Sequence, residues 1–290
     1  MDRRRFFRQM GMATGLGLGA VQIAQAGEAA GDRSAFTFAV VADPHCGEGP
    51  SKGLEGCGRG IDKFRRCLDA MASLPGDERP DFLLLLGDIH PWVLHKEQVV
   101  FPLPVHAVAG NHESTDEKRQ ILRDLFPNDF RHGDGWRDYY SFVWNGVRFI
   151  AVCDAGRGGE HIGQFCSESI LPRGQCEWIE EQLAMPEPRK VVFAHIPTEP
   201  EGRDRNMYLS RNDARWFNPL IERTRPEAMF FGHLHRATQE YRIGATRCFN
   251  VRSCSWNFGE APIGFGLVRV DGAGMHLREV DIAAYRAAAG

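Results

Sequence analysis

The chain has 290 residues, of which 43% are hydrophobic and 25% charged, a composition typical of a globular protein with a sizeable core. Its formal net charge is −3, so it lacks the basic surplus of proteins that bind the phosphate backbone of nucleic acids. Beyond the N-terminal segment, no apolar run approaches the length of a membrane span. We therefore expect no nucleic-acid partner and no membrane span in the mature chain.

The N-terminal segment has the features of an export signal. Four arginines within residues 3–8 precede a Gly-rich apolar stretch over 10–24, and an Ala-Gln-Ala sequence at 24–26 fits a cleavage site. The paired arginines followed by two phenylalanines resemble the twin-arginine signals of bacteria. A disordered basic tail or a single membrane anchor are the alternatives. We predict a signal peptide over 1–26, a flexible mature N-terminus over 27–34, export by the twin-arginine translocation machinery, and a periplasmic or extracytoplasmic location.

Cleavage of this segment changes the charge of the mature protein. It removes four Arg and one Asp, which takes the formal charge from −3 to −6. A mildly acidic protein remains compatible with a small phosphorylated substrate, provided that metal ions supply the positive charge.

Five apolar runs are each followed by a motif that contains Asp, Asn or His, whose oxygens and imidazole nitrogens suit Mn, Fe, Co, Ni or Zn. Runs of this length with polar boundaries are typical of strands buried on both faces. Open α/β sheets place their sites at the carboxyl ends of strands, so we expect the motifs to meet at one edge. The runs span 36–41, 82–86, 105–109, 191–194 and 228–231, and the motifs are Asp43-Pro44-His45, Gly87-Asp88, Gly110-Asn111-His112-Glu113, His195 and Gly232-His233-Leu234-His235.

The rest of the chain predicts a single domain over residues 35–284. Apolar spacing predicts amphipathic helices over 61–74, 116–126, 174–185 and 212–224. Asn145-Gly146, a strong hairpin signal, separates strands predicted over 139–144 and 147–153. Four more strands follow the last motif, over 238–243, 246–251, 264–270 and 275–280. Helix–strand units followed by antiparallel hairpins favour two packed sheets with helices outside.

The ordered set D-x-H, G-D, G-N-H-E, H and G-H-x-H resembles the calcineurin-like metallophosphoesterase family. The motifs extend from Asp43 to His235, and the strand–helix pattern extends the likeness over most of the mature chain. The resemblance implies an α/β fold, a four-layer α-β-β-α sandwich of two mixed β-sheets flanked by helices. It also implies two divalent or mixed-valence transition-metal ions (Mn, Fe, Zn, Ni or Co), the first held by Asp43, His45, Asp88 and His235 and the second by Asp88, Asn111, His195 and His233.

The same resemblance implies a phosphoesterase that hydrolyses a small phosphomonoester or phosphodiester through a metal-bridging hydroxide. Asp88 would bridge the two ions, and His112 would protonate the leaving oxygen or stabilise the transition state. Purple acid phosphatases carry a Tyr three residues after the bridging Asp, but Pro91 stands there in this chain, so we expect no Fe–tyrosinate site. The alternatives are a nuclease or cyclic-nucleotide phosphodiesterase and, from another class, a catalytically silent metal-dependent binding protein.

Several residues keep two interpretations. Cys46 is a nucleophile beside His45 or a structural thiol, and the second interpretation is favoured. Three disulfides are compatible with the spacing of the eight cysteines, namely Cys46–Cys57, Cys166–Cys176 and Cys248–Cys254. The loops over 155–173 and 198–211 are expected to border the cleft. Residues that either line this cleft or lie in solvated or packed positions are His90, His95, His161, Trp92, Trp136 and Trp256, together with Arg157, Arg203 and Arg205 of the loops.

Overall fold

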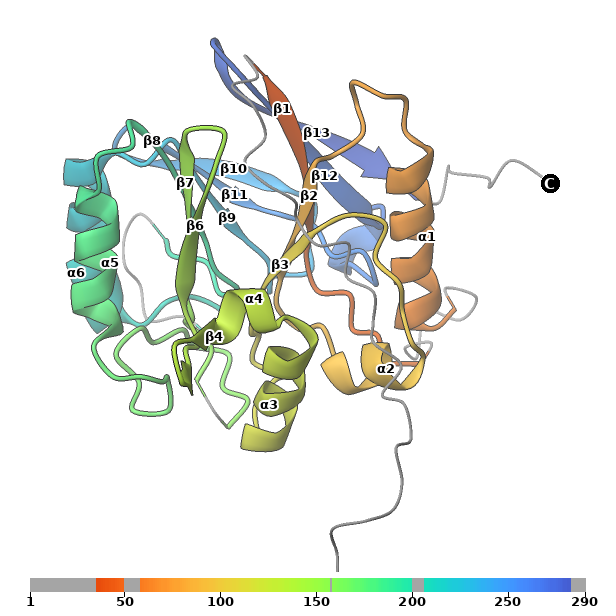
Figure 1. The fold of residues 1–290 in the computed structure, drawn as a ribbon, viewed down its shortest axis with the longest axis horizontal. Helices are drawn as coiled ribbons and strands as arrows, with labels where there is room; N and C mark the ends of the chain where they lie inside the picture. The colour runs from red at the N-terminus through yellow and green to blue at the C-terminus, as the bar shows by residue number, and fades with distance from the viewer. Residues whose placement is uncertain (1–34, 50–57, 157, 200–205, 283–290) are drawn as a thin grey trace, which may run out of the picture.

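The computed structural model describes residues 35–49, 58–156, 158–199 and 206–282 (Figure 1). The expected export signal and the flexible segment after it lie outside the described residues, as do Cys57, Arg157, Arg203 and Arg205. The predictions of export and of arginines beside the cleft therefore stay predictions.

Two mixed β-sheets form the centre of the molecule (Figure 1). The first sheet has five strands in the order β13-β12-β1-β2-β3, in which β1, β2 and β3 are parallel and β12 and β13 are antiparallel. The strands span β1 Phe36–Val41, β2 Phe82–Leu86, β3 Val105–Val108, β12 Gly264–Asp271 and β13 Gly274–Asp281.

The second sheet has six strands in the order β10-β11-β9-β8-β7-β6, with four parallel strands between two antiparallel edge strands. The strands span β6 Tyr140–Trp144, β7 Val147–Ala151, β8 Arg189–Phe193, β9 Ala228–Phe231, β10 Gln239–Ile243 and β11 Thr246–Asn250. Two short strands, β4 Arg131–His132 and β5 Gly135–Trp136, pair separately.

Phenylalanine rings pack the two sheets face to face. Phe38 of the first sheet meets Phe149 and Phe230 of the second edge-to-face, with ring centroids 5.3 and 5.7 Å apart. Such pairs add to the stabilisation that comes from burying their surface. A separate apolar cluster lies on the other face of the second sheet, where Ile179 and Phe217 of two helices contact Val192.

Helices cover the outer faces of both sheets. Helix α1 lies beside the first sheet, and α5 and α6 lie beside the second (Figure 1). The predicted four-layer α-β-β-α sandwich is therefore confirmed. The helices span α1 Gly60–Ser73, α2 Pro91–Lys96, α3 Asp116–Leu125, α4 Pro127–Phe130, α5 Gln175–Ala184 and α6 Arg211–Thr224, and η2 is a short 3₁₀ segment over Phe258–Glu260.

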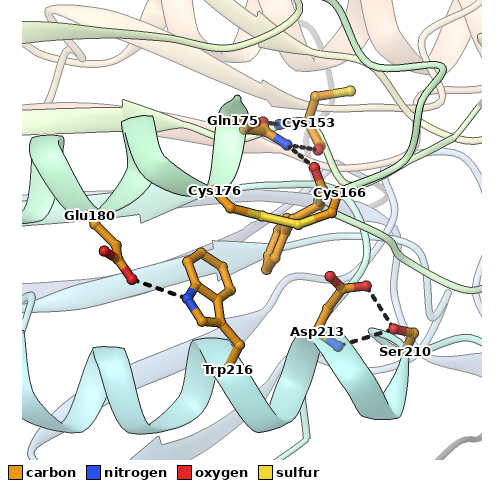
Figure 2. Close-up of a disulfide and its surroundings, with 9 residues drawn as sticks. Cys153, Cys166, Gln175, Cys176, Glu180, Ser210, Asp213 and Trp216 are labelled. Atoms are coloured by element: carbon orange, nitrogen blue, oxygen red, sulfur yellow. Dashed lines mark hydrogen bonds between the residues drawn. A yellow bond between two sulfur atoms is a disulfide. The ribbon is translucent and has the colours of Figure 1, made fainter. Parts of the chain in front are cut away.

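One of the three candidate disulfides forms. Cys166 and Cys176 are bonded and tie the loop after β7 to the start of α5, beside Trp216 of α6 (Figure 2). The pairing of Cys248 with Cys254 is wrong, because both are free thiols. Cys248 belongs to the apolar cluster under α5 and α6, whereas Cys254 belongs to the other cluster and lies beside Cys67 of α1, so the two side chains lie in different layers.

Cys46 is also a free thiol and is buried, so its pairing with Cys57 is wrong as well. Burial raises the pKa of this thiol well above its ordinary value, which disfavours the thiolate that a nucleophile requires. The structural interpretation of Cys46 is therefore supported over the nucleophilic one.

Candidate metal centre

The loops after β1, β2 and β9 share an unusual backbone conformation. In each loop two residues at positions i and i+2 have positive φ angles, which non-glycine residues rarely adopt. Each such residue costs about 1–2 kcal/mol, so the surrounding fold must hold it in place. The residues and their φ angles are Asp43 (49°), His45 (42°), Asp88 (50°), His90 (59°), His233 (73°) and His235 (49°).

Two glycines let these loops approach one another closely. A Cβ added at Gly110 would lie 2.2 Å from the backbone nitrogen of Asp88, and one at Gly232 would lie 2.6 Å from a carboxylate oxygen of Asp43. Any side chain at either position would displace a motif residue. These two glycines therefore permit the close approach of the motif loops.

The first group of candidate ligands is buried and comes from three loops. Ligand atoms of Asp43, His45, Asp88 and His235 all lie within 4.8 Å of one another. The Nε2 atom of His45 is 2.9 Å from Nε2 of His235 and 3.6 Å from Oδ2 of Asp88. The Nε2 atom of His235 is 3.4 Å from Oδ1 of Asp43. These four residues are the ones predicted to hold the first ion.

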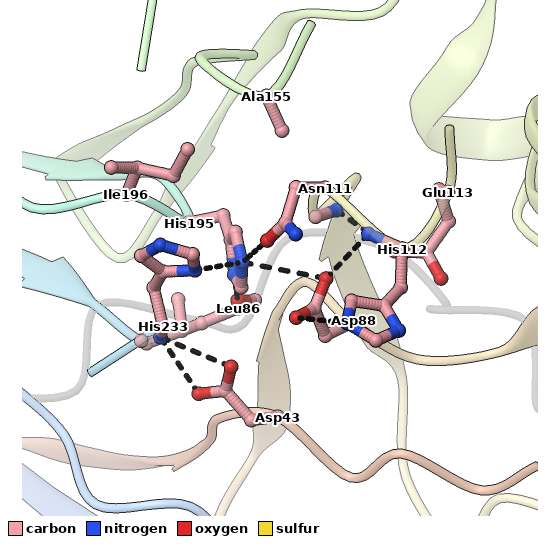
Figure 3. Close-up of polar contacts among 12 residues, drawn as sticks. Asp43, Leu86, Asp88, Asn111, His112, Glu113, Ala155, His195, Ile196 and His233 are labelled. Carbon is pink, nitrogen blue, oxygen red and sulfur yellow. Dashed lines mark hydrogen bonds and ion pairs between the residues drawn. The ribbon is translucent and has the colours of Figure 1, made fainter. Parts of the chain in front are cut away.

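The second group shares Asp88 with the first and is also buried (Figure 3). The Nε2 atom of His195 lies 3.4 Å from Oδ1 of Asp88 and 3.1 Å from Nδ1 of His233. The side-chain oxygen of Asn111 is 3.0 Å from the same nitrogen. The structure thus brings every predicted ligand of the second ion to one point beside the first group.

Hydrogen bonds on the far side of two rings show where their protons lie. The Nδ1 atoms of His195 and His235 are 2.7 and 2.8 Å from the carbonyl oxygens of Leu86 and Trp256. A carbonyl oxygen only accepts, so each Nδ1 carries a proton and Nε2 is the nitrogen that faces the carboxylates. A lone pair on that nitrogen would repel the carboxylate oxygens, so this position requires a positive charge between them, either a proton or a metal ion.

The electrostatics of the pocket agree with a cation site. Burial by itself lowers the pKa of His195, but the nearby carboxylate of Asp88 raises it to about 10. The pocket therefore attracts positive charge strongly. Two aspartates, an asparagine oxygen and four imidazoles are a donor set that suits first-row transition metals. The residues present fit the two ions that the sequence implies.

His112 lies at the mouth of this pocket and is half-buried. Its backbone N–H donates to Oδ1 of Asp88 at 2.9 Å, and its Nε2 atom is 3.9 Å from Oδ2 of the same residue. Its other ring nitrogen, Nδ1, is 3.1 Å from Nε2 of His90. Asp88 therefore fixes the position of His112, and the ring keeps Nε2 toward the candidate ion sites.

Three further acidic residues support the site, and sequence reasoning gave them no role. Oε1 of Glu48 is 2.9 Å from Nδ1 of His45. The Asp154 carboxylate accepts the backbone N–H groups of His195 and Ile196 at 3.3 and 2.9 Å. Asp154 follows the strand predicted over 147–153, so the strand-end rule applied to the other motifs would have found it. Glu48 carries no such signal in the sequence.

Glu113 is the third of these acidic residues, and it connects two of the motif loops. Its side chain is fully buried and accepts the backbone N–H groups of Ile89, His90 and Gly110 at 3.1, 3.0 and 2.8 Å. It thereby ties the loop that carries Asp88 to its own loop. The G-N-H-E motif includes this residue, but only the fold shows what its carboxylate binds.

His90 belongs to the site, which resolves its two interpretations. It is 5% exposed, its ring stacks on Trp92 with centroids 4.7 Å apart, and its Nε2 atom lies 3.1 Å from Nδ1 of His112. Its position two residues after Asp88 repeats the Asp-x-His spacing of Asp43 and His45, a signal that could have been read from the sequence.

A sequence profile of the Calcineurin-like phosphoesterase family matches residues 36–237, more than half of the chain. The chain belongs to this family. No curated protein matches it.

Solved structures share the fold of this calcineurin-like protein at low sequence identity. A dimetal phosphatase from Danio rerio is 16% identical with a TM-score of 0.61, covering 85% of this chain and 96% of that one. The inner-membrane-complex anchor GAP50 of Plasmodium is 15% identical with a TM-score of 0.58, covering 88% and 87%. A putative 5′-nucleotidase from Staphylococcus aureus is 15% identical with a TM-score of 0.51, covering 86% and 53%.

Aromatic side chains border the centre on two sides. Trp256 stacks on the ring of His235 with centroids 3.8 Å apart, and Trp92 makes a similar stack on His90. Trp136 packs against the core between the sheets instead. The ring of His161 lies 5.3 Å from that of His233, so this residue also lies beside the calcineurin-like site, whereas His95 is exposed on α2. In the part of the chain that the structure describes, no helix has the length and apolarity needed to cross a bilayer.

Proposed function

We propose that this protein is a dinuclear-metal phosphoesterase that hydrolyses a small phosphomonoester or phosphodiester. The observation that carries the proposal is the convergence of imidazole nitrogens and carboxylate oxygens on two adjacent points that share Asp88. Membership of the calcineurin-like family and the fold shared with a dimetal phosphatase support it.

We assign each ion a proposed set of ligands. Asp88 would be common to both, since one carboxylate can serve two cations about 3.5–4 Å apart. When bound, the ions would supply a nucleophile at neutral pH and neutralise the charge that develops on the phosphoryl oxygens. The first ion would be held by Asp43, His45, Asp88 and His235, and the second by Asp88, Asn111, His195 and His233.

The protein's own groups orient and shield the reacting atoms. The Leu86 and Trp256 carbonyls fix the tautomers of two ligands, and the Asp154 carboxylate holds the backbone of the loop that carries His195. Outer partners of this kind keep metal ligands correctly oriented. His112 alone among the motif residues presents a ring nitrogen at the mouth of the pocket without belonging to either proposed ligand set.

The test is hydrolysis of p-nitrophenyl phosphate and bis-p-nitrophenyl phosphate by protein loaded separately with Mn, Ni, Zn or Fe(II). We expect turnover with at least one metal, and loss of turnover with a chelator and in Asp88→Asn. Asp134→Asn, which makes the same change at an exposed position, serves as the matched control. The ratio of monoester to diester rates then assigns the substrate class.

Two other outcomes would contradict the proposal in different ways. Two bound ions per chain without hydrolysis of any ester would favour the metal-dependent binding protein. Cleavage of single-stranded DNA in preference to both small esters would favour a nuclease, against the acidic charge of the mature chain.

We also propose that the protein is exported through the twin-arginine pathway. The N-terminal sequence motivates this proposal, and the Cys166–Cys176 disulfide supports it, because such bonds persist mainly in oxidising compartments. Fractionation of bacteria that express the full chain should place a shortened product outside the cytoplasm. Replacement of Arg4 and Arg5 by Lys should keep the product full-length and cytoplasmic. Export of that variant at the normal rate would contradict the assignment.

A further inference from the structure

A chain of hydrogen bonds runs from the backbone to the mouth of the metal centre through two histidines. The backbone N–H of Gly47 donates to Nδ1 of His90 at 3.0 Å. The Nε2 atom of His90 is 3.1 Å from Nδ1 of His112. The ring of His112 then directs its own Nε2 toward Asp88.

The first hydrogen bond in this series determines which nitrogen carries the proton in both rings. A backbone nitrogen only donates, so Nδ1 of His90 accepts and carries no proton. A neutral His90 therefore holds its proton on Nε2, from which it donates to Nδ1 of His112. Nδ1 of His112 must then be an acceptor, and a neutral His112 carries its single proton on Nε2.

Two competing arrangements are disfavoured by the same contacts. Ligand atoms of His45, Glu48, His90 and His112 lie within 4.8 Å of one another, which would suit a third ion. However, the Nε2 lone pair that His90 would need is absent when Nδ1 accepts from Gly47. Glu48 could instead draw a proton to Nδ1 of His112, but its carboxylate oxygen is 3.8 Å away, beyond hydrogen-bond reach.

We propose that His90 is a positioning residue that holds His112 as the neutral tautomer with its proton on Nε2, so that His112 donates a hydrogen bond to the leaving oxygen and does not protonate it. This inference rests on the proposed function, and it narrows the substrate class. Esters whose leaving group departs as a stable oxyanion, such as a phenolate or a phosphate, suit a site with a hydrogen-bond donor and no proton donor.

The step balances without a proton from His112. A water oxygen forms a bond to phosphorus and releases a proton to solvent. The bond between phosphorus and the leaving oxygen breaks, and its electron pair stays on that oxygen. The oxyanion is stabilised by the Nε2–H of His112 as it departs and takes up a proton afterwards from water.

Nitrogen NMR of the native zinc-loaded protein tests the tautomer directly, because zinc has no unpaired electrons. In protein labelled with ¹⁵N-histidine, long-range nitrogen–proton spectra distinguish a protonated from an unprotonated ring nitrogen. Signals that vanish in His112→Gln and in His90→Gln identify the two rings. We expect both rings to carry a proton on Nε2 and none on Nδ1. A proton on Nδ1 of His112 would overturn the proposal.

A matched pair of variants tests the consequence for catalysis. His90→Gln keeps an amide donor for Nδ1 of His112, whereas His90→Glu has nearly the same shape but only accepts. Glutamate would draw a proton onto Nδ1 of His112, which leaves Nε2 of the same ring free to take up a second proton. His112 would then be a proton donor, and general acid catalysis of this kind raises rates ~10²–10⁴-fold. We expect the ratio of methyl phosphate to p-nitrophenyl phosphate turnover to rise at least ~10-fold in His90→Glu over His90→Gln, at equal metal content.

The two experiments separate this inference from the proposed function. Equal ratios in both variants, with both still binding two ions, would refute the role of His90 even if the native enzyme is active. Absence of hydrolysis by the native protein would refute the proposed function, while the NMR result would still decide the tautomer. If either variant fails to bind metal, the NMR measurement on the native protein alone is decisive.

Discussion

Glu113 offers the most direct test of how the fold holds the centre together. Its carboxylate accepts three backbone N–H groups from two loops and has no exposure to solvent. In Glu113→Ala all three backbone N–H groups remain buried but lose their hydrogen-bond acceptor. Each unsatisfied buried donor costs about 1–3 kcal/mol, so Glu113→Ala should lower the free energy of unfolding by about 3 kcal/mol or more.

Glu113→Gln makes the estimate sharper. The amide oxygen can still accept the N–H groups of Ile89 and His90, which share one carboxylate oxygen, but the amide nitrogen then faces the N–H of Gly110. One donor is lost and a donor–donor contact is created, so we expect a loss of about 1–3 kcal/mol. Glu181→Gln makes the same change at an exposed position of α5 and should be neutral within about 0.5 kcal/mol.

Urea denaturation provides the assay. It should be carried out on metal-loaded protein and repeated with a chelator, so that lost metal binding is separated from lost hydrogen bonds. The expected order of stability is control above Glu113→Gln above Glu113→Ala in both series. If Glu113→Ala unfolds at the same urea concentration as the control when metal is absent, then the three hydrogen bonds do not contribute as the structure indicates.

Four further experiments test other parts of the structure. Phe38→Ala, which removes a fully buried ring between the sheets, should lower the free energy of unfolding by about 3–5 kcal/mol in urea, and a loss below about 1 kcal/mol would contradict the face-to-face packing. The double variant Cys166→Ser, Cys176→Ser, which opens a loop of sequence separation 10, should be about 2–3 kcal/mol less stable than the oxidised native protein, and the reduced native protein should show the same loss. Removal of metal with a chelator should lower the melting temperature. A ligand present at 100 times its dissociation constant stabilises the folded state by about 2.7 kcal/mol. An unchanged melting temperature would mean that no ion binds the folded state preferentially. His112→Ala should retain two ions per chain by metal analysis while turnover of p-nitrophenyl phosphate falls ~10²–10³-fold, because the hydrogen-bond donor is removed, and full activity would remove His112 from the reaction.

Most of the regular structure could be predicted because it is encoded locally. Apolar runs buried on both faces are long and continuous, so the strand predicted over 82–86 matches β2 Phe82–Leu86 and the one over 228–231 matches β9 Ala228–Phe231. Asn145-Gly146 likewise marks the turn between β6 and β7. Helix α2 was missed, because Pro91–Lys96 is too short for its periodicity to stand out.

The sequence by itself determined the family, the sandwich of layers and the set of residues that gather at the sheet edge, since ligand type and strand-end position are both local properties. Their roles as metal ligands stay predictions until ions are bound and counted. Only the tertiary structure decided which groups orient that set, because the partners of His90, Glu113 and Asp154 lie up to 43 positions away or depend on loops held at positive φ. Hydrogen bonds are directional, and their direction fixes the protons of His112, His195 and His235. A sequence pattern states which residues meet, but the placement of a proton depends on which atoms face one another.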